Sequence, residues 1–503
     1  MIENQDIHNG WHLTLFRVIV AVCIFSCFVM SFVVSQNERE FLVAILGMCC
    51  IGVVAFPLFV WRNYNLFEPL TLIILLVLFG TPFKLIYVLW VRTRDPHVAD
   101  HVLLWQEPDV FLYGLFVVVV GWLMLVTGYM LKMPRTPISN LYLPQINDWN
   151  GRKLQIVIAV VGGISLVCFL AFVVTAGVNF SSFSEMSEKR FGDTRGAGSE
   201  RMHSSKYFLY RGAALSKFVV YFSIVWMVFK KRPFLSWMGV VLMVALFQTM
   251  LLSFVMNSRA GVALLLVDCM ILFFYLKNKI DMKLVGLCFA VAVMLMIPML
   301  AGRSKSEDSQ PIAHLVQKTL TGRNMLDIAK TCHIINGVPS KMEHRNGEML
   351  YAWLAAPVPK SVWPEKPMWA NKGLFLNRHI FGYKGDISGV PPGLIGELYW
   401  DFGKFGVWLG LFFLGILLRQ LFICFYHHRS NPTCILLYTM IITRFGMFSL
   451  GNDLGTGIVK AGLDLVPVYC LLLFIGMHRA PEPEAEPEML PATTASNQVE
   501  FVS

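Results

Sequence analysis

Arginine and lysine side chains gather in the segments that separate long apolar runs, where they could bind the phosphate groups of a substrate. A guanidinium group stays charged at any physiological pH, and its planar fork matches two phosphate oxygens at once. Arg259 is the strongest candidate, because NSRAG at 257–261 forms a short turn with little room for a charge that has no role. For the others, interfacial packing or loop solubility is the alternative. The predicted phosphate contacts in these segments are Arg190, Arg195, Arg201, Arg211, Arg259, Arg303, Arg323, Lys360, Lys366 and Arg378.

Arg444 is a different case, because it lies well inside an apolar run, in IITRFGMFSLGND. A charge at that depth is costly and is by default a functional hypothesis. We predict that it also contacts substrate, and a structural pair with a neighbouring carboxylate remains the alternative. Lys460 and Asp464 stand four residues apart in the last run, and we expect them to neutralise each other.

Two residues are the leading candidates for a general base. Glu397 lies in PPGLIGELYWDFGKFG, in the first turn of an expected span, where a partly desolvated carboxylate could have a raised pKa. The alternative is that its charge complements the helix dipole. Asp401 is one turn further along the same face and is the alternative base, and we predict that it contacts substrate. His379 is the other leading base, and the same loop holds three more histidines, which surface exposure would explain as well: His314, His333 and His344.

Other kinds of chemistry lack their sequence signatures. There is no glycine-rich phosphate loop or dinucleotide fingerprint, so nothing indicates nucleotide hydrolysis. The 11 cysteines have neither metal-ligand nor disulfide spacing. We interpret the first outward connection, which is only about 36–40, as having no acidic metal-binding pair. We therefore expect neither a metal ion nor another cofactor.

The composition predicts an all-α integral membrane protein. Of the 503 residues, 56% are hydrophobic and 15% are charged, well below the roughly 25% of soluble domains. The net charge of +10 is explained by topology and anionic lipids, without nucleic acid. The N-terminus lacks a cleavable signal, so its apolar run should remain as a span. Runs of about 20 apolar residues predict twelve spans, at 14–35, 41–61, 68–91, 109–131, 154–176, 207–229, 234–256, 260–276, 284–301, 395–425, 433–450 and 456–477.

Lysine and arginine in the short connections predict that both termini are cytoplasmic. Two long connections then face outward, at 177–206 and 302–394. The second has twelve basic and seven acidic residues, a net charge of +5, and we expect an ordered cap with a short helix at 347–354. The predicted organisation is spans one to nine in 1–301, the cap in 302–394, three spans in 395–478, and a disordered, Pro/Glu-rich cytoplasmic tail in 479–503.

Three segments resemble the Wzy-type polymerases of bacterial O-antigen and exopolysaccharide repeat units: NSRAG at 257–261, PVPKSVWPEKP at 357–367 and PPGLIGELYWDFGKFGVWLG at 391–410. The resemblance implies a GT-C-like membrane domain in the bacterial inner membrane. It also implies a reaction facing the periplasm, in which a glycan on undecaprenyl pyrophosphate is transferred to the terminal sugar of an incoming lipid-linked repeat unit. Arginines would stabilise the pyrophosphate leaving group without a metal, and Glu397 or His379 would accept the proton.

Some members of that family carry arginine, ten residues and glycine in each long loop. The chain offers this spacing at Arg201 with Gly212 and at Arg378 with Gly389, which we use only to rank arginines. The family further implies a chain-length regulator and a flippase as partners. Three alternatives stay open: an O-antigen ligase, a flippase or polysaccharide transporter, and a non-catalytic membrane scaffold.

Overall fold

The computed structural model describes residues 10–62, 64–92, 108–131, 149–175, 204–231, 236–255, 258–277, 327–355, 363, 365, 372–381, 390–429 and 431–476. Over these residues the chain is helical and contains no strand, as predicted. Ten helices of this part are long and apolar enough to cross a membrane. They match ten of the predicted spans; the run at 260–276 forms a further helix, and 284–301 lies outside the described residues.

The long helices of the first half are α1 (Gly10–Val34), α2 (Glu38–Val60), α3 (Pro69–Leu78) continuing through the π-helix η2 (Phe79–Phe83) into α4 (Lys84–Arg92), α6 (Pro108–Met130) and α7 (Gly151–Thr175). Those of the second half are α9 (Ser204–Ala213), α10 (Ser216–Phe229), α11 (Trp237–Val255), α12 (Arg259–Lys277), α18 (Gly393–His427), α19 (Pro432–Ile441) with the π-helix η6 (Ile442–Met447) and α20 (Phe448–Gly451), and α21 (Leu454–Gly476).

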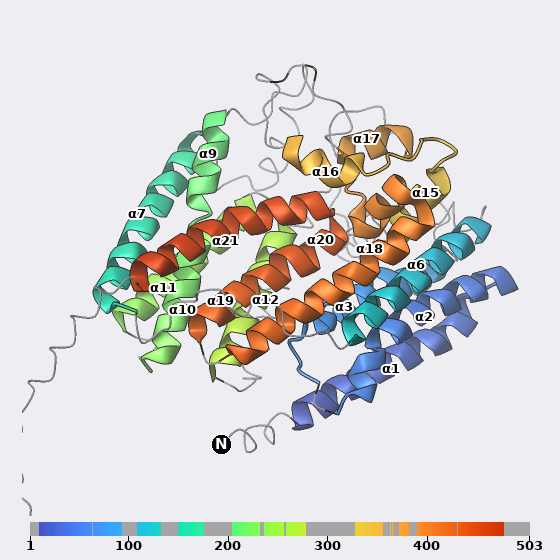
Figure 1. The fold of residues 1–503 in the computed structure, drawn as a ribbon, viewed down its shortest axis with the longest axis horizontal. Helices are drawn as coiled ribbons and strands as arrows, with labels where there is room; N and C mark the ends of the chain where they lie inside the picture. The colour runs from blue at the N-terminus through green and yellow to red at the C-terminus, as the bar shows by residue number, and fades with distance from the viewer. Residues whose placement is uncertain are drawn as a thin grey trace, which may run out of the picture.

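Three short helices lie together at one end of the bundle, which we call the cap end (Figure 1): α15 (Ile328–Gly337), α16 (Glu348–Ala355) and α17 (Lys372–His379). The short helix predicted at 347–354 is present as α16. We call the opposite end of the bundle the base end. There α7 begins beside the end of α21, and the Asn150 amide donates a hydrogen bond to the Ile475 carbonyl oxygen.

Helices α6 and α18 approach each other closely because both carry glycine at their contact. A Cβ atom added at Gly128 would lie 2.2 Å from the Phe412 carbonyl oxygen, and one at Gly415 would lie 2.1 Å from the Leu125 carbonyl oxygen. In a membrane, burial of apolar surface does little to bring helices together, because the lipid is apolar as well. Helices associate instead through close packing, which small residues allow. This contact fixes α18 on the first half of the bundle.

The cap helix α15 also packs on this face of α6. Gly114 lies fourteen residues before Gly128 in the sequence, and a Cβ there would be 2.6 Å from Sγ of Cys332 in α15. Cys332 is fully buried and is a free thiol that fills this contact. It had no evident partner in the sequence, and its role is packing. The cap is therefore seated on the bundle through α15.

A kink divides α18 and explains why the predicted span at 395–425 was unusually long. Gly403 has φ 64° and ψ −155°, a backbone conformation that a side chain would strain. The residues before it, including Glu397 and Asp401, belong to the cap-end part of the helix. The residues after it pack on α6.

We predict that Gly415→Ala lowers the thermal unfolding midpoint of the detergent-purified protein. The added methyl group meets backbone rather than a flexible side chain, so the two helices must separate at a cost of about 1–3 kcal/mol. Gly52→Ala is the matched control, because a Cβ at Gly52 has nothing within 4 Å. Equal midpoints for Gly415→Ala and the control would show that α6 and α18 do not depend on this approach.

Candidate active site

Three charged side chains meet beneath the cap, and we call them the cap-end triad: Lys372, Glu397 and Asp453. The Lys372 ammonium group donates to Oε1 of Glu397 and lies 3.4 Å from Oδ1 of Asp453. Glu397 is fully buried, and the other two residues are 7% exposed. Lys372 begins α17, Glu397 lies in α18, and Asp453 directly precedes α21. The triad therefore ties one cap helix to the ends of two spans.

The amino end of α21 supplies the remaining partners of both carboxylates. The Leu454 amide donates to Oε2 of Glu397 at 2.7 Å. The Thr456 amide and hydroxyl each donate to Asp453 at 2.7 Å, which makes Asp453 the N-cap residue of α21. Negative charge is favourable at a helix amino end. The contacts of Glu397 therefore support the alternative in which its charge complements a helix dipole. The helix concerned is α21 and not its own helix, α18.

Asp401 holds α16 in place. Its two carboxylate oxygens accept hydrogen bonds from the Met349 and Leu350 amides, each at 3.1 Å. The Asn346 amide also donates to the Asp401 carbonyl oxygen at 3.1 Å. The carboxylate is fully buried and caps the amino end of the short helix. These contacts favour a structural role, and the predicted substrate contact of Asp401 stays a prediction.

His379 lies at the other end of α17 from Lys372, roughly 10 Å further along the helix axis. Its side chain is exposed, with its ring 4.2 Å from that of Phe375. Phe375 in turn stacks on Trp400 of α18, with ring centroids 5.4 Å apart. Arg378 lies beside His379 in the same last turn. The two candidate bases are therefore on different helices: His379 is exposed at the end of α17, whereas Glu397 of α18 is enclosed beside Lys372 at the start of α17.

A second ionic cluster lies deeper in the bundle, and we call it the Arg444 network. The Arg444 guanidinium donates from Nη2 to Asp268 at 2.7 Å and from Nε to Asp464 at 2.9 Å. Tyr221 donates to Asp268 and accepts from Nη2 of Arg444, while Lys217 donates to Asp464 at 2.5 Å. These residues come from α10, α12, η6 and α21. Arg444 itself lies in a π-helical turn, a local widening that is frequent at functional sites.

The predicted mutual neutralisation of Lys460 and Asp464 is incomplete, because Asp464 acts electrostatically on Lys460 but also bonds cations from other helices. The Asp464 carboxylate is bonded by Lys217 and Arg444, both from other helices. Sequence periodicity detects neighbours on one helix, and it gave no sign of these partners. The alternative given for Arg444, a structural pair with a neighbouring carboxylate, corresponds to its contacts with Asp268 and Asp464. Its contact with substrate is still untested.

Two further basic residues, Arg211 and Lys460, lie near this network. Lys460 stands one turn before Asp464 on α21, and Arg444, Arg211 and Lys217 all act electrostatically on it. Among the described residues, two carboxylates, Asp268 and Asp464, belong to the Arg444 network. The structure thus brings the predicted Arg211 and Arg444 into one region. Arg259 begins α12, and the other predicted cations lie outside the described residues: Arg190, Arg195, Arg201, Arg303, Arg323, Lys360 and Lys366.

Lys330 is a buried cation that sequence reasoning missed. Its ammonium group in α15 lies 3.5 Å from the Gly451 carbonyl oxygen, and the residue is 1% exposed. Burial lowers the pKa of Lys330 to about 8, with Asp327 and Asp453 opposing the shift. Asp453 was missed as well, although Asp453 and Thr456 at the start of an apolar run match a helix-capping pattern.

The chain is therefore a multi-pass, all-helical membrane protein with charged groups enclosed inside its bundle. A family model described as "Putative O-antigen polymerase" matches residues 202–447, from just before α9 to the end of η6. Neither a curated protein nor a solved structure matches the chain. The family match confirms the resemblance to the Wzy-type polymerases, and it supports a membrane-embedded enzyme of the glycosyltransferase type that polymerises a surface polysaccharide from lipid-linked oligosaccharides.

We predict that Lys372→Met strongly destabilises the protein, because it leaves two buried carboxylates without their cation. Breaking a buried pair in this way costs about 3–5 kcal/mol. Adding Glu397→Gln should restore part of the thermal unfolding midpoint, since only Asp453 then remains charged, at a helix amino end. Lys341→Met is the control, at an exposed cap lysine. The assignment of the triad is contradicted when Lys372→Met is no less stable than this control.

The buried amine of Lys330 predicts a specific pH dependence. Its folded-state pKa is depressed, so its contribution to stability is complete only at high pH and is lost as pH falls through about 8. From pH 7 to pH 10, the unfolding free energy of the wild type should rise by about 2 kcal/mol relative to Lys330→Met. Denaturant titration in mixed micelles measures this difference. Parallel curves for the two proteins would mean that Lys330 is not enclosed.

Proposed function

We propose that this protein polymerises undecaprenyl-pyrophosphate-linked oligosaccharide repeat units into an O-antigen or exopolysaccharide at the outer face of the bacterial inner membrane. The observation that carries the proposal is the family match over residues 202–447. The membrane bundle supports it, because a lipid-linked donor and a lipid-linked acceptor must both reach the enzyme from the bilayer. A cap over one end of the bundle would cover their sugars.

The cap end faces the periplasm in this proposal, and both termini are cytoplasmic. The support comes from the helix ends of the base end, where lysine and arginine accumulate: Lys230 and Lys231 after α10, Lys277 at the end of α12 and Arg429 after α18. Positive charge in short connections favours the cytoplasmic side.

The reaction requires an exchange of bonds at one anomeric carbon. The bond from that carbon to the pyrophosphate oxygen breaks, and a bond to the acceptor hydroxyl oxygen forms. The pyrophosphate leaves with its negative charge, which guanidinium and ammonium groups stabilise without a metal ion. The hydroxyl proton passes to a base. The energy comes from the lipid pyrophosphate linkage, so no nucleotide is consumed.

The geometry suggests how the residues divide these tasks. The cations around the Arg444 network, among them Arg211 and Lys217, supply positive potential for the leaving group, and Arg259 with the loop arginines would complete the phosphate contacts. Arg444 acts mainly by holding this region together, since its guanidinium donates to two carboxylates. We keep His379 as the candidate base, because its side chain is exposed. Glu397 is enclosed by Lys372, and we assign to it the positioning of the cap.

Deletion of the gene in its host tests this function. The deletion strain should carry surface glycan with a single repeat unit, because ligation continues while extension stops. Wild-type complementation should restore the ladder on a gel, whereas Arg259→Ala and His379→Ala, at matched membrane levels, should shorten or abolish it. Arg429→Ala, at the base end, is the control and should restore the full ladder.

Each other pattern identifies an error. A ladder that survives deletion contradicts polymerisation, and complete loss of attached glycan points to a ligase or a flippase. Single units after deletion combined with full ladders from Arg259→Ala and His379→Ala would leave the function in place and show that these two residues do not form the site.

A further inference from the structure

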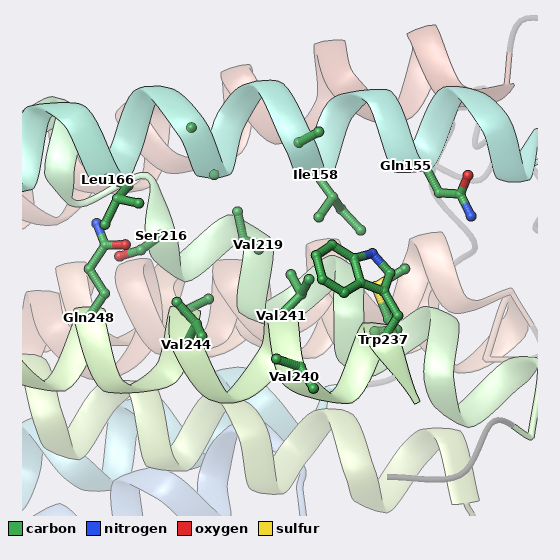
Figure 2. Close-up of a pocket in the computed structure, with 15 residues that line it drawn as sticks. Gln155, Ile158, Leu166, Ser216, Val219, Trp237, Val240, Val241, Val244 and Gln248 are labelled. Carbon is green, nitrogen blue, oxygen red and sulfur yellow. The ribbon is translucent and has the colours of Figure 1, made fainter. Parts of the chain in front are cut away.

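The apolar groove between α7 and α11 does not suit the polar part of a substrate (Figure 2). The described residues that line it include no aspartate, glutamate, lysine or arginine. Val240 and Val244 in its lining are 51% and 53% exposed, so the groove opens toward lipid, whose acyl chains can fill it. Recognition of a sugar needs hydrogen-bonding side chains that are accessible from water. The cap end holds such a group.

Arg345 and Glu348 flank the tight turn that leads into α16. Nη1 of Arg345 lies 3.6 Å from Oε2 of Glu348, which is an ion pair but is too long for a hydrogen bond. The Arg345 amide donates to the Trp400 carbonyl oxygen at 3.1 Å, and the Glu348 amide donates to the Arg345 carbonyl oxygen at 2.9 Å. Between them, Asn346 has φ 48°, a left-handed conformation that is uncommon outside glycine. These contacts fix the backbone from which the two charged side chains project.

Both side chains keep hydrogen-bonding capacity that no described residue uses. Nε of Arg345 and Oε2 of Glu348 are buried and have no hydrogen-bond partner within the described part of the chain. The two side chains are 30% and 36% exposed, so their other atoms are accessible from solvent. Buried polar groups are nearly always satisfied, and an exception requires an explanation. A ligand that accepts from the guanidinium and donates to the carboxylate would provide one.

The pair lies beside His379, the exposed candidate base. The Arg345 guanidinium lies over the Phe375 ring, 5.5 Å from its centroid, and the His379 ring centroid is 4.2 Å from the same point. Trp400 stacks on Phe375 and supports this ring from α18. The guanidinium and the imidazole therefore contact one phenyl ring, and they are close enough to meet neighbouring groups of one bound saccharide.

We propose that Arg345 and Glu348 bind hydroxyl groups of the acceptor's terminal sugar and hold it beside His379. The inference rests on the proposed function, in which His379 is the candidate base for the acceptor hydroxyl. A sugar hydroxyl both accepts and donates, so a single group uses both charged side chains. Tyr351 follows one turn after Glu348 on the same face of α16 and is 51% exposed. Its ring face carries partial negative charge, on which the C–H groups of a sugar can pack.

The carboxylate of Glu348 distinguishes a sugar from the substrate's phosphates. Phosphate oxygens carry negative charge, so the carboxylate would repel them. It would also find no donor among them for its own oxygen atoms. A hydroxyl group meets neither difficulty. The pair therefore suits the saccharide, and the phosphates fall to cations elsewhere in the protein.

A fragment that can only accept tests the proposal. The host's repeat unit is prepared as a methyl glycoside, which has the sugar hydroxyls but no pyrophosphate leaving group. Its binding to the purified full-length protein in nanodiscs is measured by calorimetry. Glu348→Ala and Arg345→Met should each raise the Kd about tenfold, because hydrogen bonds to a charged group are lost. Glu343→Ala and Lys341→Met, at exposed cap positions, are the matched controls and should bind as the wild type does.

Two further measurements keep the result decisive. If Arg345→Met lowers the thermal unfolding midpoint, Arg345→Lys carries the same prediction, because it keeps the charge over Phe375 but loses the planar fork. Inorganic pyrophosphate is the second probe. Glu348→Ala should leave its binding unchanged, whereas tighter binding would show that Arg345 serves an anion site and would overturn the proposal.

The binding assay also separates this inference from the function. The proposal is overturned if the wild type does not bind the methyl glycoside, or if the Arg345 and Glu348 variants bind it as their controls do. The pair is then a surface ion pair, and polymerisation by the wild type would still support the proposed function. If the wild type binds the glycoside through these residues yet never extends a lipid-linked chain, the sugar subsite stands and the proposed function fails.

Discussion

The need to neutralise charge inside an apolar bundle governs the architecture of this protein. Arg444 cannot shed its proton, and its burial is tolerated because Asp268 and Asp464 surround it. The two carboxylates arrive on α12 and α21, so the guanidinium fixes these helices against η6. The same requirement operates at the cap end, where Lys372 draws together the first turns of two spans. Charge pairing thus sets the positions of helices that are distant in sequence.

Close contact between helix backbones is the second feature that fixes the arrangement of the helices. Glycines at the contact of α6 and α18 allow these helices to touch, and the glycine kink at Gly403 separates the cap-end part of α18 from its membrane part. Glu397 and Asp401 therefore project among the cap helices while the remainder of α18 packs in the bundle. The exposed ring of His379 is held on α17, whose other end is anchored by the triad. Buried carboxylates and an exposed imidazole are in this way combined at the cap end.

The sequence predicted those features that depend on local pattern, and it missed those that depend on pairing across helices. Hydropathy located ten spans and the short helix α16 correctly, because length and apolar content are readable along the chain. Glu397 attracted attention by its place in the first turn of a span, and Arg444 by its depth in an apolar run. Their partners Lys372 and Asp268 did not, since no periodicity connects residues on separate helices. The pairing of Asp464 with Lys460 was incomplete for the same reason, since the carboxylate is also bonded by cations from two other helices.

The most direct test of the account is reconstitution of the purified protein in vesicles with an undecaprenyl-pyrophosphate-linked repeat unit as the only substrate. The account predicts a ladder of glycans on lipid, release of undecaprenyl pyrophosphate at one molecule per added unit, and the same rate in the presence of EDTA. Products that never exceed one repeat unit, from protein that is folded and membrane-inserted, would contradict polymerisation. A ladder that disappears with EDTA would contradict charge stabilisation by arginine and lysine alone.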